Sequence, residues 1–151
     1  MGSPSRLGGR DRPDPAGEWW LTACEMEISI TFTDAPIVVS ALTLPSREVG
    51  AVVEFYGIVR EMEGADALQG LYYEAYEAMA DRHLRRIFGE LTSGYRCEAI
   101  TFVHRLGWVP VGEASLFLRV LASHRKEALA LCGLAIERMK ADVPIWKMSN
   151  A

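Results

Sequence analysis

Alternating polar and apolar positions predict a series of short strands. Residues 27–33 (EISITFT) follow the period-2 pattern of a strand with one buried face. Four further segments, rich in β-branched and aromatic residues, also predict strands: 51–59, 71–76, 99–103 and 115–121. Gly57 interrupts the second strand, which indicates a bulge or the close approach of another backbone.

Two longer segments, 77–93 and 123–141, have the spacing of helices with one buried face. The apolar positions of the first are Ala80, Leu84, Ile87, Phe88 and Leu91. Those of the second are Ala128, Leu131, Ala135 and Met139, with Leu129, Cys132 and Ile136 beside them. We expect Gly94 to end the first helix and Pro144 to prevent the second from continuing.

The remaining segments predict connections. Residues 36–48 fit a short helix or an irregular connection, and 61–69 fit a polar loop. Gly107, Pro110 and Gly112 indicate a turn between the last two strands. Because the strands do not alternate regularly with helices, the pattern favours an α+β domain with mostly antiparallel pairing.

Length and composition suit one domain. The chain has 151 residues, of which 50% are hydrophobic, which is enough for one core but not for a second full domain. Residues 1–25 are rich in Gly, Pro, Arg and Asp and have no sustained period. We therefore expect 1–25 to be a flexible N-terminal extension and 26–151 to be the domain.

Charge and cysteine content narrow the function classes. A net charge of -4 and a pI of about 5.4 argue against binding to nucleic acid or to an anionic membrane surface. No apolar run reaches the roughly 18 residues needed to cross a bilayer. The three cysteines, Cys24, Cys97 and Cys132, form no C-x-x-C pair, so we expect reduced thiols in a cytoplasmic protein.

Candidate chemistry lies in clusters of basic residues. At the start of the second helix, His124, Arg125 and Lys126 stand where cations are disfavoured by about 0.3–1 kcal/mol each, which suggests a compensating anion such as a phosphate. The alternative is that they point into water or pair with Glu127. From this feature alone the alternative is favoured.

Three other cations are candidates. Lys140 falls in the last helical turn, where it either stabilises the helix end or faces a ligand. Lys147 follows an apolar Pro-Ile-Trp stretch; such a lysine can act as an acid, base or nucleophile, although an exposed terminal lysine is the simpler reading. Arg60 follows a strand and could present its guanidinium to a pocket or only to solvent. His83, His104 and Arg105 are interpreted as structural.

The chain has no Gly-rich phosphate loop, no zinc-binding helix motif and no cysteine in a basic setting with a partner histidine. We expect neither a metal nor a cofactor. An enzyme of this composition would use lysine, arginine and histidine on an anionic substrate.

Taken in order, these basic features resemble the large subunit of molybdopterin synthase. The resembling segments are GAVVEFYGIVR (50–60), LYYEAYEAMA (71–80), VHRLGWVPVGE (103–113), ASHRKEA (122–128) and MKADVPIWK (139–147). The ordered set G-x-V-R, H-R-x-G, S/A-H-R and K-x-x-x-P-I/F-W-K is far more specific than any one motif. The resemblance covers about residues 27–147, nearly all of the domain.

The resemblance implies an α+β hammerhead fold, with a mostly antiparallel sheet and two main helices, and a homodimer within a heterotetramer. The partner would be a small ubiquitin-like sulfur-carrier subunit that inserts its C-terminal Gly-Gly thiocarboxylate. The substrate would be cyclic pyranopterin monophosphate, which two sulfur transfers convert to molybdopterin. By motif, Lys140 and Lys147 resemble the catalytic lysines, and Val59, Arg60, His124 and Arg125 resemble substrate-binding residues.

Helix geometry adds a prediction of its own. Arg125 and Lys140 lie near opposite ends of one helix, so at about 1.5 Å per residue their backbones are roughly 22 Å apart. One small pterin cannot easily bridge that distance. We therefore expect a composite site, with His124 and Arg125 of one protomer facing Lys140 and Lys147 of its dimer mate.

One departure from the family pattern leaves an alternative open. Relatives usually continue well past the tryptophan-lysine pair with an acidic residue close behind, whereas only Met148–Ala151 follow Lys147 here. The alternative is a carrier-binding homologue that has lost turnover with its tail. Retention of both lysines and of the His-Arg pair argues against it.

Overall fold

The computed structural model describes residues 26–148. The expected flexible extension at 1–25, including Cys24, lies outside the described residues. Within them the chain forms two helices and nine strands, arranged as a four-stranded sheet, a three-stranded sheet and a two-stranded hairpin. The α+β prediction is therefore confirmed, with one parallel and otherwise antiparallel strand pairs.

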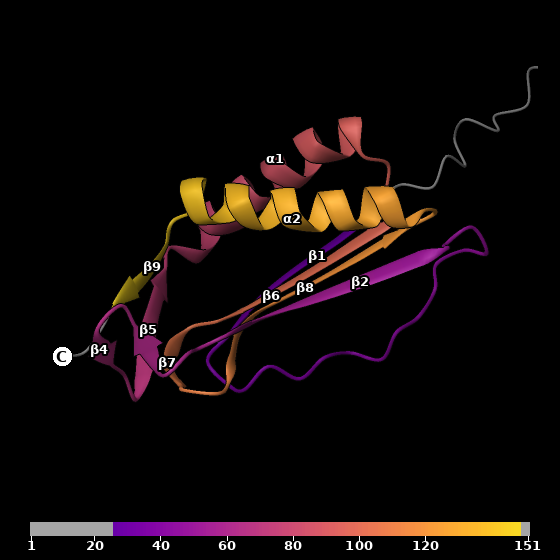
Figure 1. Cartoon of the computed structure of the whole chain (residues 1–151). Coiled ribbons are helices and arrows are strands. Elements are labelled where there is room, and N and C mark those ends of the chain that lie inside the picture. The colour runs from indigo at the N-terminus through magenta and orange to yellow at the C-terminus, as the bar shows by residue number, and fades with distance from the viewer. Residues whose placement is uncertain (1–25, 149–151) are drawn as a thin grey trace, which may run out of the picture.

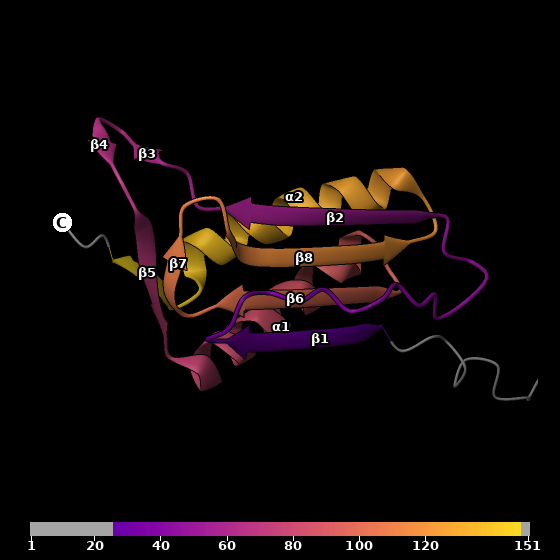
Figure 2. The ribbon, with the colours of Figure 1, turned by 90° about the horizontal axis from the view of Figure 1, so that it is seen from below.

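The main sheet has the order β1-β6-β8-β2 (Figure 2). Its strands are β1 (Glu27–Thr33), β6 (Ala99–Arg105), β8 (Ala114–Ala122) and β2 (Ala51–Ile58). β1 pairs with β6 in parallel, and β8 pairs with β6 and β2 in antiparallel fashion. The register of β2 against β8 shifts between Gly57 and Ile58, as the expected bulge requires.

Both helices cover one face of this sheet (Figure 1). α1 spans Glu77–Gly94 and α2 spans Arg125–Asp142, close to the predicted ranges. The predicted core positions are buried or partly buried, with one exception: Leu129 is 60% exposed because it lies off the buried face of α2. The largest fully buried side chains are Phe88, Phe102, Phe117, Leu84 and Ile87.

A smaller sheet stands at one end of the main sheet, and its strands run across the direction of the main strands (Figure 2). Its order is β7-β5-β9, with bounds Gly107–Pro110, Gly70–Ala75 and Ile145–Met148. β5 was expected, but β7 and β9 were not, because strands of four residues give too short a pattern to detect. The expected polar loop at 61–69 contains β3 (Met62–Glu63) and β4 (Asp66–Ala67), paired as a short hairpin.

The face of the main sheet opposite the helices is crossed by the segment between β1 and β2 (Figure 1). This segment contains no helix, so the irregular alternative for 36–48 is confirmed. Arg119, which is 5% exposed, holds it in place: its guanidinium donates to the Ser40 carbonyl at 3.0 Å and pairs with Glu54 at 2.8 Å.

The end of α1 differs from the expectation. Gly94 is the last helical residue and does not adopt a positive φ, whereas Gly64, Gly107 and Gly112 do. Extended Tyr95 ends the helix instead, with its N–H donating to the Leu91 carbonyl. The glycine signal was correct for the position of the stop but not for its geometry.

Candidate functional site

A cavity of about 400 Å³ opens where the two sheets meet the C-terminal end of α2. This size suits a small organic ligand. Its walls come from the end of β2, the β3–β4 hairpin, β5, β6, β8, α2 and β9. Segments far apart in the sequence thus supply one site.

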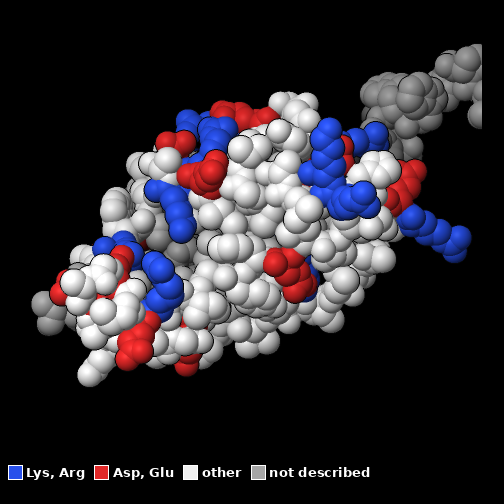
Figure 3. Space-filling view, in the orientation of Figure 1, with Lys and Arg blue, Asp and Glu red and all other residues white. Residues whose placement is uncertain are grey.

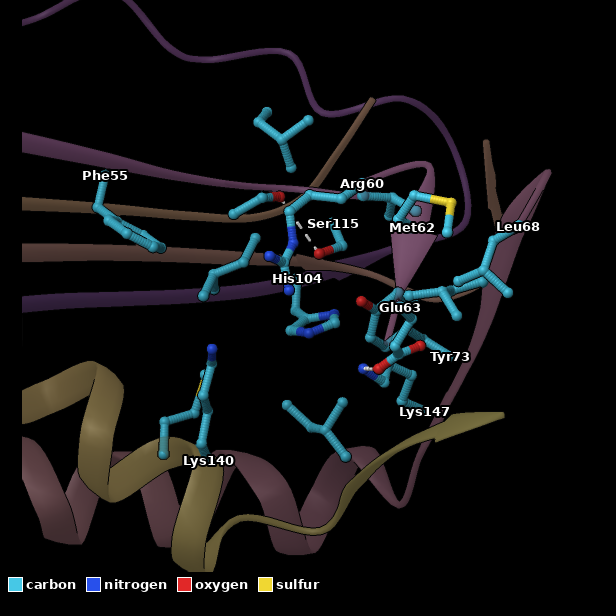
Figure 4. Close-up of a pocket in the computed structure, with 17 residues that line it drawn as sticks. Phe55, Arg60, Met62, Glu63, Leu68, Tyr73, His104, Ser115, Lys140 and Lys147 are labelled. Atoms are coloured by element: carbon cyan, nitrogen blue, oxygen red, sulfur yellow. Dashed lines mark hydrogen bonds and ion pairs between the residues drawn. The ribbon is translucent and has the colours of Figure 1, made fainter. Parts of the chain in front are cut away.

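Three cations line this cavity: Arg60, Lys140 and Lys147 (Figure 4). Arg60 lies two residues beyond the end of β2 at Ile58, Lys140 lies in the last turn of α2, and Lys147 lies on β9. All three residues are exposed. Gathered cations in a hollow attract an anionic ligand and can bind more than one negative group.

Lys147 already has one acidic partner. Its ammonium forms an ion pair with Glu63 of β3, and both side chains are nearly half exposed. Neither Arg60 nor Lys140 forms an ion pair with another residue between 26 and 148. Their charges are therefore available to a ligand.

Val59, immediately before Arg60, contributes in a different way. Its side chain is 3% exposed and lines the cavity. Its N–H donates to the Glu113 carbonyl at 3.0 Å, and its carbonyl accepts from Gly112 at 2.8 Å. Val59 therefore faces the cavity with an apolar side chain, and its paired backbone fixes the position from which the Arg60 side chain starts.

His104 forms part of the cavity wall although it is only 4% exposed. Its Nδ1 lies 2.8 Å from the Arg105 carbonyl. Because a carbonyl only accepts, Nδ1 carries the proton in the neutral ring and Nε2 carries the lone pair. Burial lowers the pKa of His104 to about 4, and the hydrogen bond to the Arg105 carbonyl opposes this shift only in part.

The pKa of His104 predicts an acid-sensitive fold. Between pH 6.5 and about 4 the unfolded chain binds a proton that the folded chain does not, so stability falls as the pH falls through this window. We expect this group to remove about 2–3 kcal/mol from the free energy of unfolding between neutral pH and pH ~4. Urea unfolding of wild type and His104→Gln across this range measures the effect. The same pH dependence in both proteins would contradict it.

A second basic cluster lies at the other end of the molecule. A more open hollow of about 450 Å³ is lined by Gly50, Ser123, His124, Arg125 and Lys126. A Cβ on Gly50 would lie 2.2 Å from the Ser123 carbonyl oxygen, so only glycine permits the residue before β2 to approach the residue before the N-cap of α2 this closely. His124 is the N-cap of α2 and makes no side-chain capping hydrogen bond. Basic side chains accordingly gather at both ends of the molecule (Figure 3).

The structure thus separates the candidate residues into two groups. Val59, Arg60, Lys140 and Lys147 share one cavity, whereas His124 and Arg125 line the other hollow. α2 is continuous from Arg125 to Asp142, so the roughly 22 Å separation calculated for Arg125 and Lys140 holds within one chain.

Sequence reasoning did not place Glu63 or His104 in the site. Glu63 gave no signal, because a lone acid in a polar loop is normally solvated. His104 was interpreted as structural; its backbone hydrogen bond fits that reading, but its position in the cavity wall was not anticipated. The one available signal in the sequence was a histidine at the end of an apolar strand. Only the fold shows that this histidine faces the cavity.

Residues 26–148 provide neither a reactive thiol nor a metal site. Cys97 and Cys132 are free and buried, and burial raises the pKa of both thiols, that of Cys97 to about 11. Neither thiol is therefore a nucleophile at neutral pH. In this range no three His, Cys, Asp or Glu side chains are grouped to hold a metal ion, and neither helix is long and apolar enough to span a membrane.

Comparisons with known proteins agree on one family. The family model described as MoaE protein matches residues 32–142. The chain is 42% identical over 98 residues to the molybdopterin synthase catalytic subunit of Oryza sativa subsp. indica, covering 65% of this chain and 51% of the relative. For the same subunit of Caulobacter vibrioides it is 33% identical over 125 residues, covering 80% and 82%. The chain spans about half to two thirds of the length of the first curated relatives that it matches.

Solved structures agree on the fold. Molybdopterin synthase from Staphylococcus aureus superimposes with a TM-score of 0.69 at 33% identity, covering 83% of this chain and 90% of that chain. A complex of subunits 1 and 2 of the molybdopterin-converting factor from Helicobacter pylori gives a TM-score of 0.62 at 26% identity, covering 80% and 83%. The expected large-subunit fold, with two main helices and mostly antiparallel sheets, is therefore confirmed.

Proposed function

Since this chain belongs to the MoaE protein family, we propose that it catalyses the sulfur transfers of molybdopterin synthase. The proposed substrate is cyclic pyranopterin monophosphate, and the proposed sulfur donor is the thiocarboxylate at the C-terminus of a small carrier subunit. Two successive transfers give the dithiolene of molybdopterin. The observation that carries the proposal is the cavity in which Arg60, Lys140 and Lys147 converge.

Electrostatics gives this cavity its role in the reaction. The thiocarboxylate and the cyclic phosphate are both anions, so bringing them together requires fixed cations to offset their repulsion and hold the reacting atoms in line. The described cysteines are protonated at neutral pH, and the proposed reaction needs no thiol of its own because the sulfur arrives on the carrier. Arg60 would bind a substrate oxyanion with its planar guanidinium.

We assign different roles to the two lysines. Lys140 would contact the incoming carrier tail, because its side chain points from the end of α2 towards the cavity that it lines (Figure 4). Lys147 would move protons or stabilise the opening phosphate ester. For this its ion pair with Glu63 must first be replaced by contact with the substrate. A lysine ammonium can do either, since it donates three hydrogen bonds and is not bound to one geometry.

We propose that the complete site is composite. His124 and Arg125 of one protomer would face Lys140 and Lys147 of its dimer mate and bind the phosphate at the N-terminus of α2. The separation of the two hollows within one chain supports this arrangement, because a pterin cannot reach from one to the other. The uncapped N-terminus of α2 also supports an anion there.

The proposed assembly is a homodimer with one ubiquitin-like carrier at each outer end, its Gly-Gly tail inserted into the cavity. The Helicobacter pylori relative, solved as a complex of subunits 1 and 2, supports a small-subunit partner. We also propose a cytoplasmic location, which the free thiols Cys97 and Cys132 support.

A non-catalytic carrier-binding homologue is the competing function. Purified protein mixed with thiocarboxylated carrier and cyclic pyranopterin monophosphate should form molybdopterin, followed as a time course. Carrier binding without product would favour the competing function. The absence of both carrier binding and product would exclude both functions.

Glu63 offers a finer test of the cavity. Glu63→Gln removes the acidic partner of Lys147 and should lower the KM for the pterin substrate about 2- to 5-fold at low salt, since a half-exposed ion pair contributes only about 0–1 kcal/mol. Glu61→Gln removes a neighbouring exposed acid outside the cavity lining and serves as the control. An unchanged or raised KM in Glu63→Gln would argue that Glu63 does not compete with the substrate.

A further inference from the structure

The proposed reaction has a step that needs a proton acceptor, and the three cations are not acceptors while they carry their charge. When sulfur leaves the carrier's acyl carbon, that carbon must gain an oxygen, and water is the source. The C–O bond forms as water loses one proton, the C–S bond breaks with its electron pair going to sulfur, and the carboxylic acid left on the carrier releases its own proton to solvent to become a carboxylate. Water adding to an acyl carbon needs a proton acceptor.

The cavity contains few proton acceptors. Arg60, Lys140 and Lys147 are donors when charged, and Glu63 is paired with Lys147. His104 is different: its Nδ1–H is used by the Arg105 carbonyl, which leaves the lone pair on Nε2. Within residues 26–148, Nε2 makes no hydrogen bond and is not among the fully buried polar atoms that lack a partner. It is thus an accessible base on the cavity wall.

The ring of His104 is held firmly. Tyr73 of β5 contacts it edge to face, with centroids 5.1 Å apart, and the Phe102 ring lies at a centroid distance of 6.3 Å. Figure 4 places the ring between Arg60 on one side and Lys140 on the other, beside the Lys147–Glu63 pair. A base fixed in this way keeps its orientation as the ligands enter.

On the basis of the proposed function, we propose that Nε2 of His104 accepts the proton of the water that converts the carrier's spent acyl group to a carboxylate. His104 then passes that proton to solvent or to the departing sulfur. No oxidant or reductant is required, because only acyl and proton transfers occur.

The charged surroundings explain how the imidazole gains basicity when it is needed. Other elements place the following titratable groups around the cavity: Arg60 after β2, Glu63 on β3, Tyr73 on β5, Lys140 on α2 and Lys147 on β9. β8 adds only the neutral Ser115 and Leu116. In the empty cavity burial keeps the ring neutral; two bound anions raise its pKa towards the pH of the reaction, where a general base is most effective.

His104→Asn tests the proposal in the assembled enzyme. Asparagine keeps a donor for the Arg105 carbonyl but removes Nε2, so the single-turnover rate of carrier carboxylate formation should fall about 100-fold. The KM values for carrier and pterin should change less than about 3-fold, because the residues that bind both ligands before the reaction are unchanged. The acid limb of the wild-type pH–rate profile should be absent from the variant. Intact-mass measurement of the carrier follows the reaction.

Two further variants make the result decisive. His83→Asn, on α1 and outside the cavity lining, is the matched control and should keep the wild-type rate and acid limb. If His104→Asn does not fold, His104→Gln should likewise lose the acid limb. An active wild type together with a folded His104 variant that retains over half the rate, or the acid limb, would overturn the role of His104. An inactive wild type would overturn the proposed function instead.

Discussion

Lys140→Ala is expected to lower the single-turnover rate of sulfur transfer by on the order of 100- to 1,000-fold. The ammonium of Lys140 forms no ion pair within residues 26–148 and lines the cavity, so its charge is available to the thiocarboxylate of the proposed carrier. Without it, two anions must approach each other with one fewer cation. The rate of molybdopterin formation with saturating thiocarboxylated carrier measures the loss.

Comparing the rates and carrier affinities of Lys140→Ala and Lys147→Ala tests whether the two lysines have different roles. If Lys140 receives the carrier tail, Lys140→Ala should also weaken carrier affinity, whereas Lys147→Ala should lose rate at nearly unchanged affinity. Arg82→Ala removes an exposed cation of α1 outside the cavity lining and is the control for net charge. Full activity in both lysine variants would exclude a catalytic role for either.

Complementation between two inactive chains should restore activity. In the proposed homodimer, Arg125→Ala and Lys140→Ala would each damage every site. A mixed dimer would contain one site that combines the intact Arg125 of one chain with the intact Lys140 of the other. Random pairing places about half of the chains in mixed dimers, each with one working site of two, so activity should recover to about one quarter of wild type.

This experiment requires proof that the chains have exchanged. Differently tagged chains, refolded together and isolated through both tags, should have about half of the wild-type activity. The double variant Arg125→Ala/Lys140→Ala paired with Lys140→Ala provides the control, since no site in that dimer is intact. A verified mixed dimer without recovery would show that both residues act within one chain.

Much of the fold could be predicted from the sequence because local pattern and tertiary burial agree there. The buried faces of α1 and α2 follow the 3.6-residue period, and β1 follows strict alternation. β9 could not be predicted, because residues 145–148 are mostly exposed and become a strand only by pairing with β5. Tertiary pairing, not local propensity, forms that strand.

The residues of the candidate site could likewise be predicted only in part. Arg60, Lys140 and Lys147 were found because motif and charge single them out, and the structure brings them to one cavity. Glu63 was missed because its partner Lys147 is 84 positions away in the sequence. No local pattern encodes such a pair. His104 required knowledge of which face of β6 looks into the cavity, and that depends on where the small sheet stands.

The continuity of α2 has a consequence for communication between active sites. In the proposed dimer this single helix carries a phosphate-binding end into one reaction centre and a catalytic lysine into the other. If this continuous helix shifted along its axis as a rigid body, a displacement that withdraws Lys140 from one centre would advance Arg125 into its neighbour. The two centres would then be mechanically linked, and occupancy of one would alter the readiness of the other without any change in quaternary structure.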